Sequence, residues 1–156
     1  MNQALLQRLA TLEGESAVRR LMARYMDLCD VPRAPVEARD LAQLFTEDAI
    51  WEGLGTQTAQ TFGQHRGREA IAAFVGGYLP PSVHFQLNLH YLTSESIVVD
   101  GEGAQGQWIM QQISTYADGR NELFGTRLNI DFRCVDGTWQ IAHFRTQRLL
   151  NLELRP

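Results

Sequence analysis

The stretch Ser82-Val83-His84-Phe85-Gln86-Leu87-Asn88-Leu89-His90-Tyr91 alternates strictly between polar and apolar residues. An alternation of period two predicts a β-strand with one polar and one apolar face. The polar face presents His84, Gln86, Asn88 and His90, whereas the apolar face is typical of the core side of a sheet. A strand whose polar face lies in water shows the same pattern, so the spacing alone leaves a functional face and a solvated face both open.

Strand-like segments follow this stretch and are separated by Asp-Gly turns. Asp100-Gly101, Asp118-Gly119 and Asp136-Gly137 each lie between strand-like runs, which is a strong hairpin signal. The expected strands cover residues 84–92, 95–99, 104–116, 121–135 and 138–150. The C-terminal half is therefore predicted to be an antiparallel meander.

The N-terminal half has the apolar spacing of amphipathic helices. Residues 3–30 are expected to form one long helix, or two joined near Gly14, which ends before Pro32 because proline cannot continue a helix. Two shorter helices are expected over residues 37–45 and 67–78, and a hairpin is expected over residues 53–61. Helices followed by strands predict a single α+β domain over residues 1–156.

Composition excludes several classes of partner. The chain has 156 residues and a formal net charge of -4, and it contains no lysine, so it lacks the basic stripe of a nucleic-acid-binding protein. Cys29 and Cys134 show none of the close spacing of a metal site or a disulfide framework. The sequence shows no signal-peptide pattern and no apolar run of about 18 residues. We expect a cytoplasmic protein with neither nucleic-acid nor membrane partners.

Large apolar residues occupy both faces of the strand predicted over residues 104–116. Trp108 and Met110 lie on one face, and Ile109 and Ile113 lie on the other. A sheet that is wet on one side does not need apolar residues on both. We therefore expect the outer face to be buried in a homodimer or a higher homo-oligomer.

Asp30 is predicted to lie at the C-terminus of the long helix, where the negative end of the helix dipole disfavours a carboxylate. An exposed aspartate tolerates this cost, but a carboxylate held there for a cationic or proton-sharing partner also fits. A metal site is not expected, because His84 and His90 are separated by about 20 Å at a strand rise of roughly 3.3 Å per residue. Cys29 falls on an apolar helix face, which is typical of an inert thiol.

Five segments together resemble the SnoaL-like branch of the NTF2-like superfamily. They are Tyr25-Met-Asp-Leu-Cys-Asp30, Leu44-Phe-Thr-Glu-Asp-Ala-Ile-Trp51, Gly67-Arg-Glu-Ala-Ile71, His84 with Asn88, and Val135-Asp-Gly-Thr-Trp-Gln-Ile141. The resemblance implies a cone-shaped, cystatin-like α+β barrel, in which N-terminal helices pack in a curved antiparallel sheet that encloses one pocket.

The resemblance also implies a site. The pattern is similar to that of scytalone dehydratase, bile-acid dehydratase and hexachlorocyclohexane dehydrochlorinase, in which an Asp at the end of the first helix supports a His on a later strand. Asp30 and His84 match those positions, and Tyr25 matches a tyrosine five residues before the Asp. An arginine on the last strand completes the pocket; Arg145 and Arg148 differ in parity, so only one points inward, and Arg145 is favoured.

These residue types suit an elimination reaction. An imidazole titrates near neutral pH and removes a proton next to a carbonyl or leaving group when a carboxylate orients it. The predicted function is therefore a cofactor-independent lyase, a dehydratase acting on a small hydrophobic cyclic or aromatic-derived substrate. A polyketide cyclase or ketosteroid-type isomerase, and a non-catalytic ligand carrier or dioxygenase small-subunit-like scaffold, are the alternatives. The expected substrate contacts are Asn88, Gln86, Trp51 and Trp108.

The mouth of the pocket is expected to be formed by two long connections. These are the Pro-rich segment from Val31 to Glu37 and the segment from Gly53 to Thr61. Both are longer than a turn needs, and long connections on a rigid scaffold often carry specificity.

Overall fold

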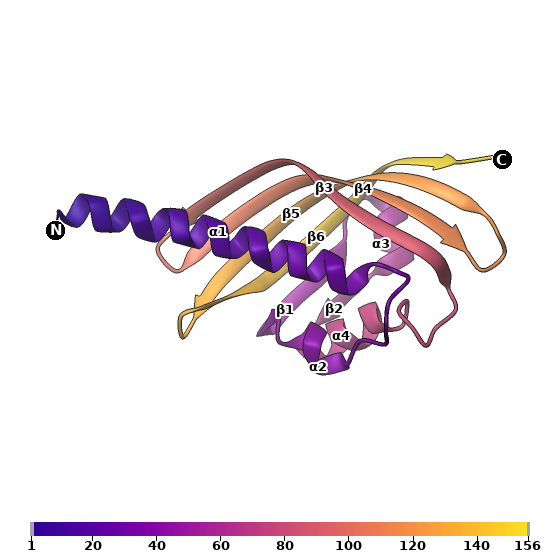
Figure 1. Ribbon diagram of the computed structural model, residues 1–156, viewed down its shortest axis with the longest axis horizontal. Coiled ribbons are helices and arrows are strands. Elements are labelled where there is room, and N and C mark those ends of the chain that lie inside the picture. Colours follow the sequence, from indigo (N-terminus) through magenta and orange to yellow (C-terminus); the bar gives the residue numbers. More distant parts are fainter. Residues whose placement is uncertain (1, 156) are drawn as a thin grey trace.

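The computed structural model describes residues 2–155 and has the predicted α+β class (Figure 1). The helices are α1 (Gln3–Cys29), α2 (Ala38–Ala42), α3 (Thr56–Phe62) and α4 (Arg68–Gly76). The strands are β1 (Phe45–Gly53), β2 (Gln64–Arg66), β3 (Phe85–Asp100), β4 (Gly103–Tyr116), β5 (Asn121–Val135) and β6 (Thr138–Glu153).

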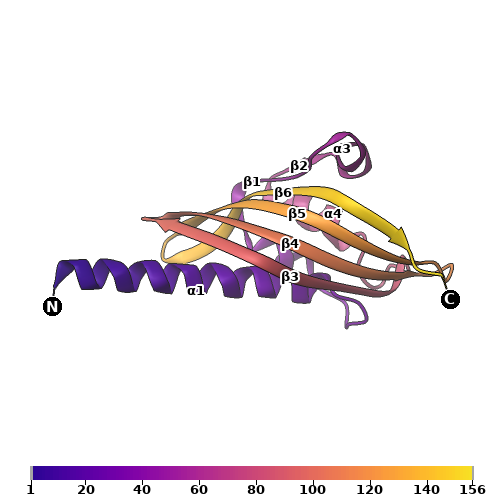
Figure 2. The same ribbon diagram turned by 90° about the horizontal axis from the view of Figure 1, so that it is seen from above.

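The six strands form one curved sheet in the order β2-β1-β6-β5-β4-β3. The long strands β3 to β6 are the predicted antiparallel meander, in which the Asp-Gly turns close the hairpins. The sheet is not antiparallel throughout, because β1 pairs with β6 in parallel. Figure 2 shows that the sheet curves over α1, and its edge strands β2 and β3 remain apart within residues 2–155.

Helix α1 is one continuous helix that passes through Gly14, where an added Cβ would lie 3.1 Å from Val99 Cγ1. Its C-terminal half packs on the concave face of the sheet and buries an apolar stripe, whereas its first turns extend past the sheet (Figure 1). The buried residues on this stripe include Val18, Met22, Tyr25, Met26 and Leu28. The exposed leucines on the extending turns are Leu5, Leu6, Leu9 and Leu12.

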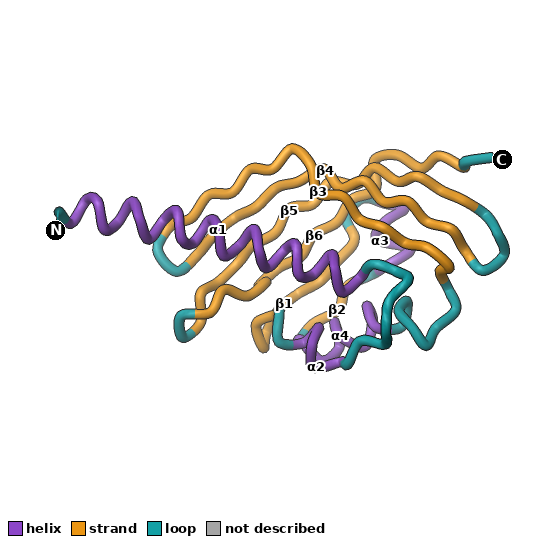
Figure 3. The backbone as a smooth tube through the Cα atoms, in the orientation of Figure 1, coloured by secondary structure: helices purple, strands orange, loops and turns teal. Residues whose placement is uncertain are grey.

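The segment 53–61 joins the antiparallel strands β1 and β2, as the predicted hairpin requires, but it contains α3, which the sequence analysis missed (Figure 3). Gly55 and Gly63 flank the helix with φ angles of 76° and 64°, values that glycine adopts without steric cost. The glycines therefore begin and end a helix within the connection of the hairpin. Helices α1, α2 and α4 lie within the ranges 3–30, 37–45 and 67–78, where the sequence predicted helices.

Strand β3 begins at Phe85, so His84 precedes it. The register shifts between Phe85 and Leu87, where the two-residue step on β3 faces a one-residue step on β4. This β-bulge adds one residue and changes which side chains face inward. The prediction that His84 lies on one strand face with Asn88 and His90 is therefore wrong. A second shift between Thr93 and Ser96 lets one strand cover the two predicted over 84–92 and 95–99.

The convex face of the sheet carries an apolar row that crosses four strands. Leu89 pairs with Ile113, Ile113 with Leu123, and Leu123 with Leu152. Leu152 is 46% exposed and the other three are partly buried. This row is the surface that the predicted homodimer would bury.

Among the described residues, none of the helices combines the length and the hydropathy that a membrane crossing requires.

Candidate active site

A cavity of about 320 Å³ lies between the concave face of the sheet and the helices. Its walls are mainly apolar and aromatic, and they come from α1, β1, α3, α4 and the four long strands. Met26, Trp51, Phe74, Leu128 and Phe144 are examples. Apolar walls with a few convergent polar groups are typical of a small-molecule site.

The end of α1 places Asp30 beside this cavity. Asp30 has extended backbone angles (φ -71°, ψ 143°), so the helix stops there and the chain turns toward β3. Val31 then forms an antiparallel bridge with Asn88, with two N–H to carbonyl distances of 2.9 Å. Because the two bridged segments run in opposite directions, the residue before Val31 approaches the residues after Asn88. This bridge brings Asp30 to His90.

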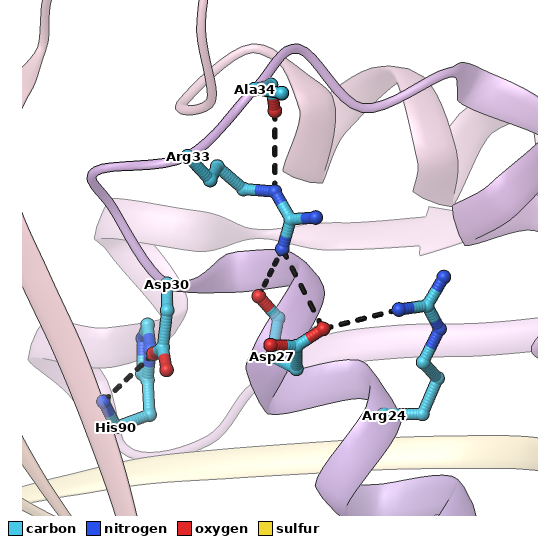
Figure 4. Close-up of polar contacts among 6 residues, drawn as sticks. All are labelled: Arg24, Asp27, Asp30, Arg33, Ala34 and His90. Carbon is cyan, nitrogen blue, oxygen red and sulfur yellow. Dashed lines mark hydrogen bonds and ion pairs between the residues drawn. The ribbon is translucent and has the colours of Figure 1, made fainter.

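Asp30 and His90 form a hydrogen-bonded pair (Figure 4). His90 Nδ1 lies 2.8 Å from Asp30 Oδ1, and the His90 backbone N–H donates to the same oxygen at 3.0 Å. The His90 side chain is 9% exposed and the Asp30 side chain 33% exposed. A carboxylate acceptor places the imidazole proton on Nδ1, so Nε2 of the neutral ring carries a free lone pair. His90 lines the cavity, and its Nε2 makes no hydrogen bond to any residue from 2 to 155.

The predicted hydrogen bond between Asp30 and His84 is therefore wrong. His84 is exposed, and its ring lies 5.2 Å from that of Tyr78 and 5.5 Å from that of Tyr116. It contributes to the lining of the cavity at this aromatic group, six residues from His90 along the chain. The Val31 to Asn88 bridge explains the change of partner, because it directs Asp30 toward the later histidine.

Arg33 stabilises the end of α1 that carries Asp30 (Figure 4). Its guanidinium donates to the Asp27 carbonyl in the last turn of the helix, which otherwise accepts only a long hydrogen bond of 3.4 Å from the Asp30 backbone N–H. The Asp27 carboxylate forms ion pairs with Arg24 at 3.1 Å and Arg33 at 3.8 Å. A cation at a helix C-terminus offsets the negative end of the dipole. The position that disfavours Asp30 therefore carries a compensating charge.

Asn88 is the most buried polar side chain of β3 that lines the cavity, at 4% exposed. Its Oδ1 accepts hydrogen bonds from Ser114 Oγ at 2.8 Å and from Gln112 Nε2 at 2.9 Å. These two donors fix the orientation of the amide. The Asn88 NH₂ group has no partner within the described chain, so it is available to a bound molecule. Asn88, predicted as a substrate contact, thus lies where such a contact is possible.

Tyr25 and Trp51 also line the cavity. Trp51 Nε1 donates to the Tyr25 hydroxyl at 3.1 Å, and its ring stacks on Phe144 with centroids 5.4 Å apart. Burial raises the pKa of Tyr25 well above its ordinary value, and neighbouring Cys29 adds to the shift. Burial also raises the pKa of the Cys29 thiol to about 12. Tyr25 therefore keeps its proton near neutral pH, and Cys29 is a thiol, which is a poor nucleophile.

Of the two candidate arginines, Arg148 lines the cavity and Arg145 does not. Phe144, Thr146 and Arg148 alternate along the inner face of β6, which leaves Arg145 on the outer face. There Arg145 donates to Asp131 at 2.7 Å and to His143 Nδ1 at 2.9 Å. The parity argument is correct, but the preference for Arg145 is wrong.

Two predicted substrate contacts lie outside the cavity lining. Gln86 is exposed at the β-bulge and donates to the Ala117 carbonyl at 3.4 Å. Trp108 is buried, but its ring lies over Gly106 and contacts Phe132, and its indole N–H donates to Glu95 at 3.3 Å. Trp108 thus belongs to the core next to the cavity.

The two segments predicted to form the pocket mouth differ in outcome. The 53–61 segment supplies Thr58 and Thr61 to the lining, but no residue of the 31–37 segment contributes.

Across residues 2–155, no group of three or more His, Cys, Asp or Glu side chains is arranged as a metal site.

Comparison with protein families places this geometry in context. The family model of the SnoaL-like domain matches residues 10–145, and no curated protein matches the chain. Three solved structures illustrate the similarity. A hexachlorocyclohexane dehydrochlorinase, LinA Type2, has a TM-score of 0.77 and 18% identity, with 96% of this chain and 93% of that chain covered. A candidate scytalone dehydratase from Novosphingobium aromaticivorans has a TM-score of 0.76 and 18% identity, with coverage of 93% and 90%.

An NTF2-like protein with a cystatin-like fold, from Novosphingobium aromaticivorans, has a TM-score of 0.72 and 23% identity, with coverage of 93% and 88%. At these identities the similarity establishes a shared fold.

Proposed function

The chain belongs to the SnoaL-like domain family, and from this premise we propose that it is a cofactor-independent lyase that catalyses a dehydratase-type elimination. The observation that carries the proposal is the hydrogen bond between Asp30 and His90 at the wall of an apolar cavity. Two of the similar structures bear the names of a dehydrochlorinase and a candidate dehydratase, both of which denote eliminations. The aromatic walls suit a small hydrophobic cyclic substrate.

In the proposed reaction His90 is the general base. Its Nε2 takes a proton from a carbon next to a carbonyl group, and Asp30 stabilises the imidazolium that forms, through Nδ1. The electron pair of the C–H bond becomes a C=C bond as the C–O bond to the neighbouring hydroxyl breaks. The proton then passes to the departing oxygen, which leaves as water, and the His90 imidazole is neutral again.

Asn88 and Tyr25 supply hydrogen bonds for the charge that develops on oxygen. The Asn88 NH₂ group is oriented by Gln112 and Ser114 before any substrate binds, so no reorganisation is needed during the reaction. Tyr25 keeps its phenolic proton because burial raises its pKa. Each group can donate to an enolate oxygen or to the departing hydroxyl.

The proposal is tested by turnover of a panel of cyclic β-hydroxy ketones with and without a carboxylate substituent, in which formation of the conjugated enone is followed by absorbance. His90→Ala is expected to lower kcat/KM by about 10²- to 10⁴-fold, the usual contribution of a general base. Asp30→Asn is expected to lower kcat strongly, because it removes the charge that stabilises the imidazolium. His143→Ala and Asp40→Asn are the matched controls, since both residues lie outside the cavity lining, and they should retain activity.

The variant His84→Ala tests which of the two histidines, His84 or His90, is the general base. If His84→Ala abolishes turnover while His90→Ala does not, the base has been assigned to the wrong histidine. If no member of the panel is converted by the wild type, this elimination is not the function.

A further inference from the structure

Arg148 is a half-buried cation in the cavity wall. Its guanidinium carbon lies 4.0 Å from the centroid of the Phe124 ring and 5.6 Å from that of Phe62. Its backbone N–H donates to Thr58 Oγ1 at 3.0 Å, which ties β6 to α3 at this point. A guanidinium that stacks on a ring keeps its N–H edges free for a planar, bidentate acceptor.

The Arg148 side chain has no counter-ion in the described part of the chain. No carboxylate lies within 4.0 Å of its guanidinium nitrogens, and the guanidinium donates no hydrogen bond to residues 2–155. The nearby acid Glu122 already pairs with Arg120 at 3.3 Å and accepts from the Tyr116 hydroxyl at 3.3 Å. Arg120 in turn pairs with Asp118 at 2.8 Å.

Burial costs this cation free energy that a bound anion would recover. Burial lowers the pKa of Arg148, although Tyr116, Glu122 and Tyr78 oppose the shift. Tyr78 and Tyr116 also line the cavity, and both lie close enough to Arg148 to affect its pKa.

We infer that Arg148 binds a carboxylate of the substrate, at the opposite side of the cavity from His90. The identification of this ligand as the substrate rests on the proposed function, whereas the anion site rests on the unpaired guanidinium alone. His90 lies on β3 and Arg148 on β6, with β4 and β5 between them. Three strand spacings amount to roughly 14 Å along the sheet, and both side chains project into the cavity. The substrate is thus a cyclic acid whose reacting carbon and carboxylate lie at opposite ends.

A matched pair of probes tests this inference by binding, without turnover. Isothermal titration calorimetry at pH 8 and low salt compares 2-naphthoate with 2-naphthamide, which have nearly the same shape and differ in charge. The wild type is expected to bind the carboxylate about tenfold more tightly, the lower end of the range for a hydrogen bond to a charged group. Arg148→Met should abolish the difference. Arg127→Met removes the same charge from an exposed position outside the cavity lining and should preserve it.

Equal affinity of the wild type for both probes, or no binding of either, overturns the inference, and this comparison needs no variant. A preference that persists in Arg148→Met also overturns it. His90→Ala should retain the preference, so loss of the proposed lyase activity and loss of the anion site are separate results.

Discussion

Gly53→Ala should destabilise the protein by displacing the helix that forms one wall of the cavity. A Cβ at Gly53 would lie 2.4 Å from the Thr58 carbonyl oxygen, 2.8 Å from the Thr58 carbonyl carbon and 3.2 Å from Ala59 N. These are backbone atoms of α3, so no side-chain rotation relieves the contact. Overpacking of this kind costs about 3 kcal/mol, the upper part of its usual range. For a chain of 156 residues this corresponds to a fall in Tm of about 6–12 °C.

Differential scanning calorimetry measures the fall in Tm, and 2-naphthoate binding reports the displacement of α3, because Thr58 accepts from the Arg148 N–H. Gly76→Ala is the matched control. It adds the same methyl group within α4, where the nearest atom, Leu41 Cδ1, is 4.0 Å away, and alanine favours a helix over glycine. A Gly53→Ala protein that melts at the wild-type temperature would refute the close approach of β1 and α3.

Two further predictions concern pH and assembly. The pKa of Cys29 is about 12 in the folded protein against 9.0 ordinarily, so the unfolded chain loses the thiol proton at a lower pH than the folded chain does. The contribution of the protonated thiol to the free energy of unfolding is therefore complete below pH 9 and is lost as the pH rises toward 12. Urea unfolding should show the free energy of unfolding falling by up to about 1.4 kcal/mol per pH unit above pH 9. Cys29→Ala should reduce this dependence on pH between pH 9 and 10. An unchanged dependence in Cys29→Ala would contradict the assignment of the effect to the Cys29 thiol. We also expect sedimentation velocity to show a homodimer at micromolar concentration, which Leu123→Glu should dissociate by placing a charge in the apolar row of the convex face. A wild type that sediments only as a monomer would disprove this interface.

The local signals in the sequence were sufficient for most of the fold. The hairpin turns lie where predicted, because the preference of Asp-Gly for a turn is local. They are Asp100-Gly101, Asp118-Gly119 and Asp136-Gly137. The hairpin of β1 and β2 also forms, but α3 within its connection was missed, since glycines with positive φ occur at helix ends as well as in turns. The parallel pairing of β1 with β6 depends on segments about 90 residues apart, and no short-range pattern reveals it.

The sequence indicated which residues lie near the site, but it did not indicate which histidine contacts Asp30. Asp30, Tyr25 and Asn88 lie at or beside the cavity, because the end of α1 and the period of β3 place them there, and their roles stay predictions. The partner of Asp30 could not be derived, since a single extra residue in the β-bulge changes the strand phase after His84. His90 was visible as the second histidine of the same stretch, but only the tertiary bridge between Val31 and Asn88 selects it.

The parallel pairing of β1 with β6 also affects the order in which the protein acquires its cavity. Trp51 on β1 stacks on Phe144, its partner on the neighbouring strand β6, so these two parts of one wall are brought together only after β6 has been synthesised. Contacts between distant segments carry a large loop-closure cost and tend to form late. The meander of β3 to β6 is built from neighbouring hairpins, so we expect it to form before β1 pairs with β6. Synthesis of the final strand is thus the event that completes the binding site.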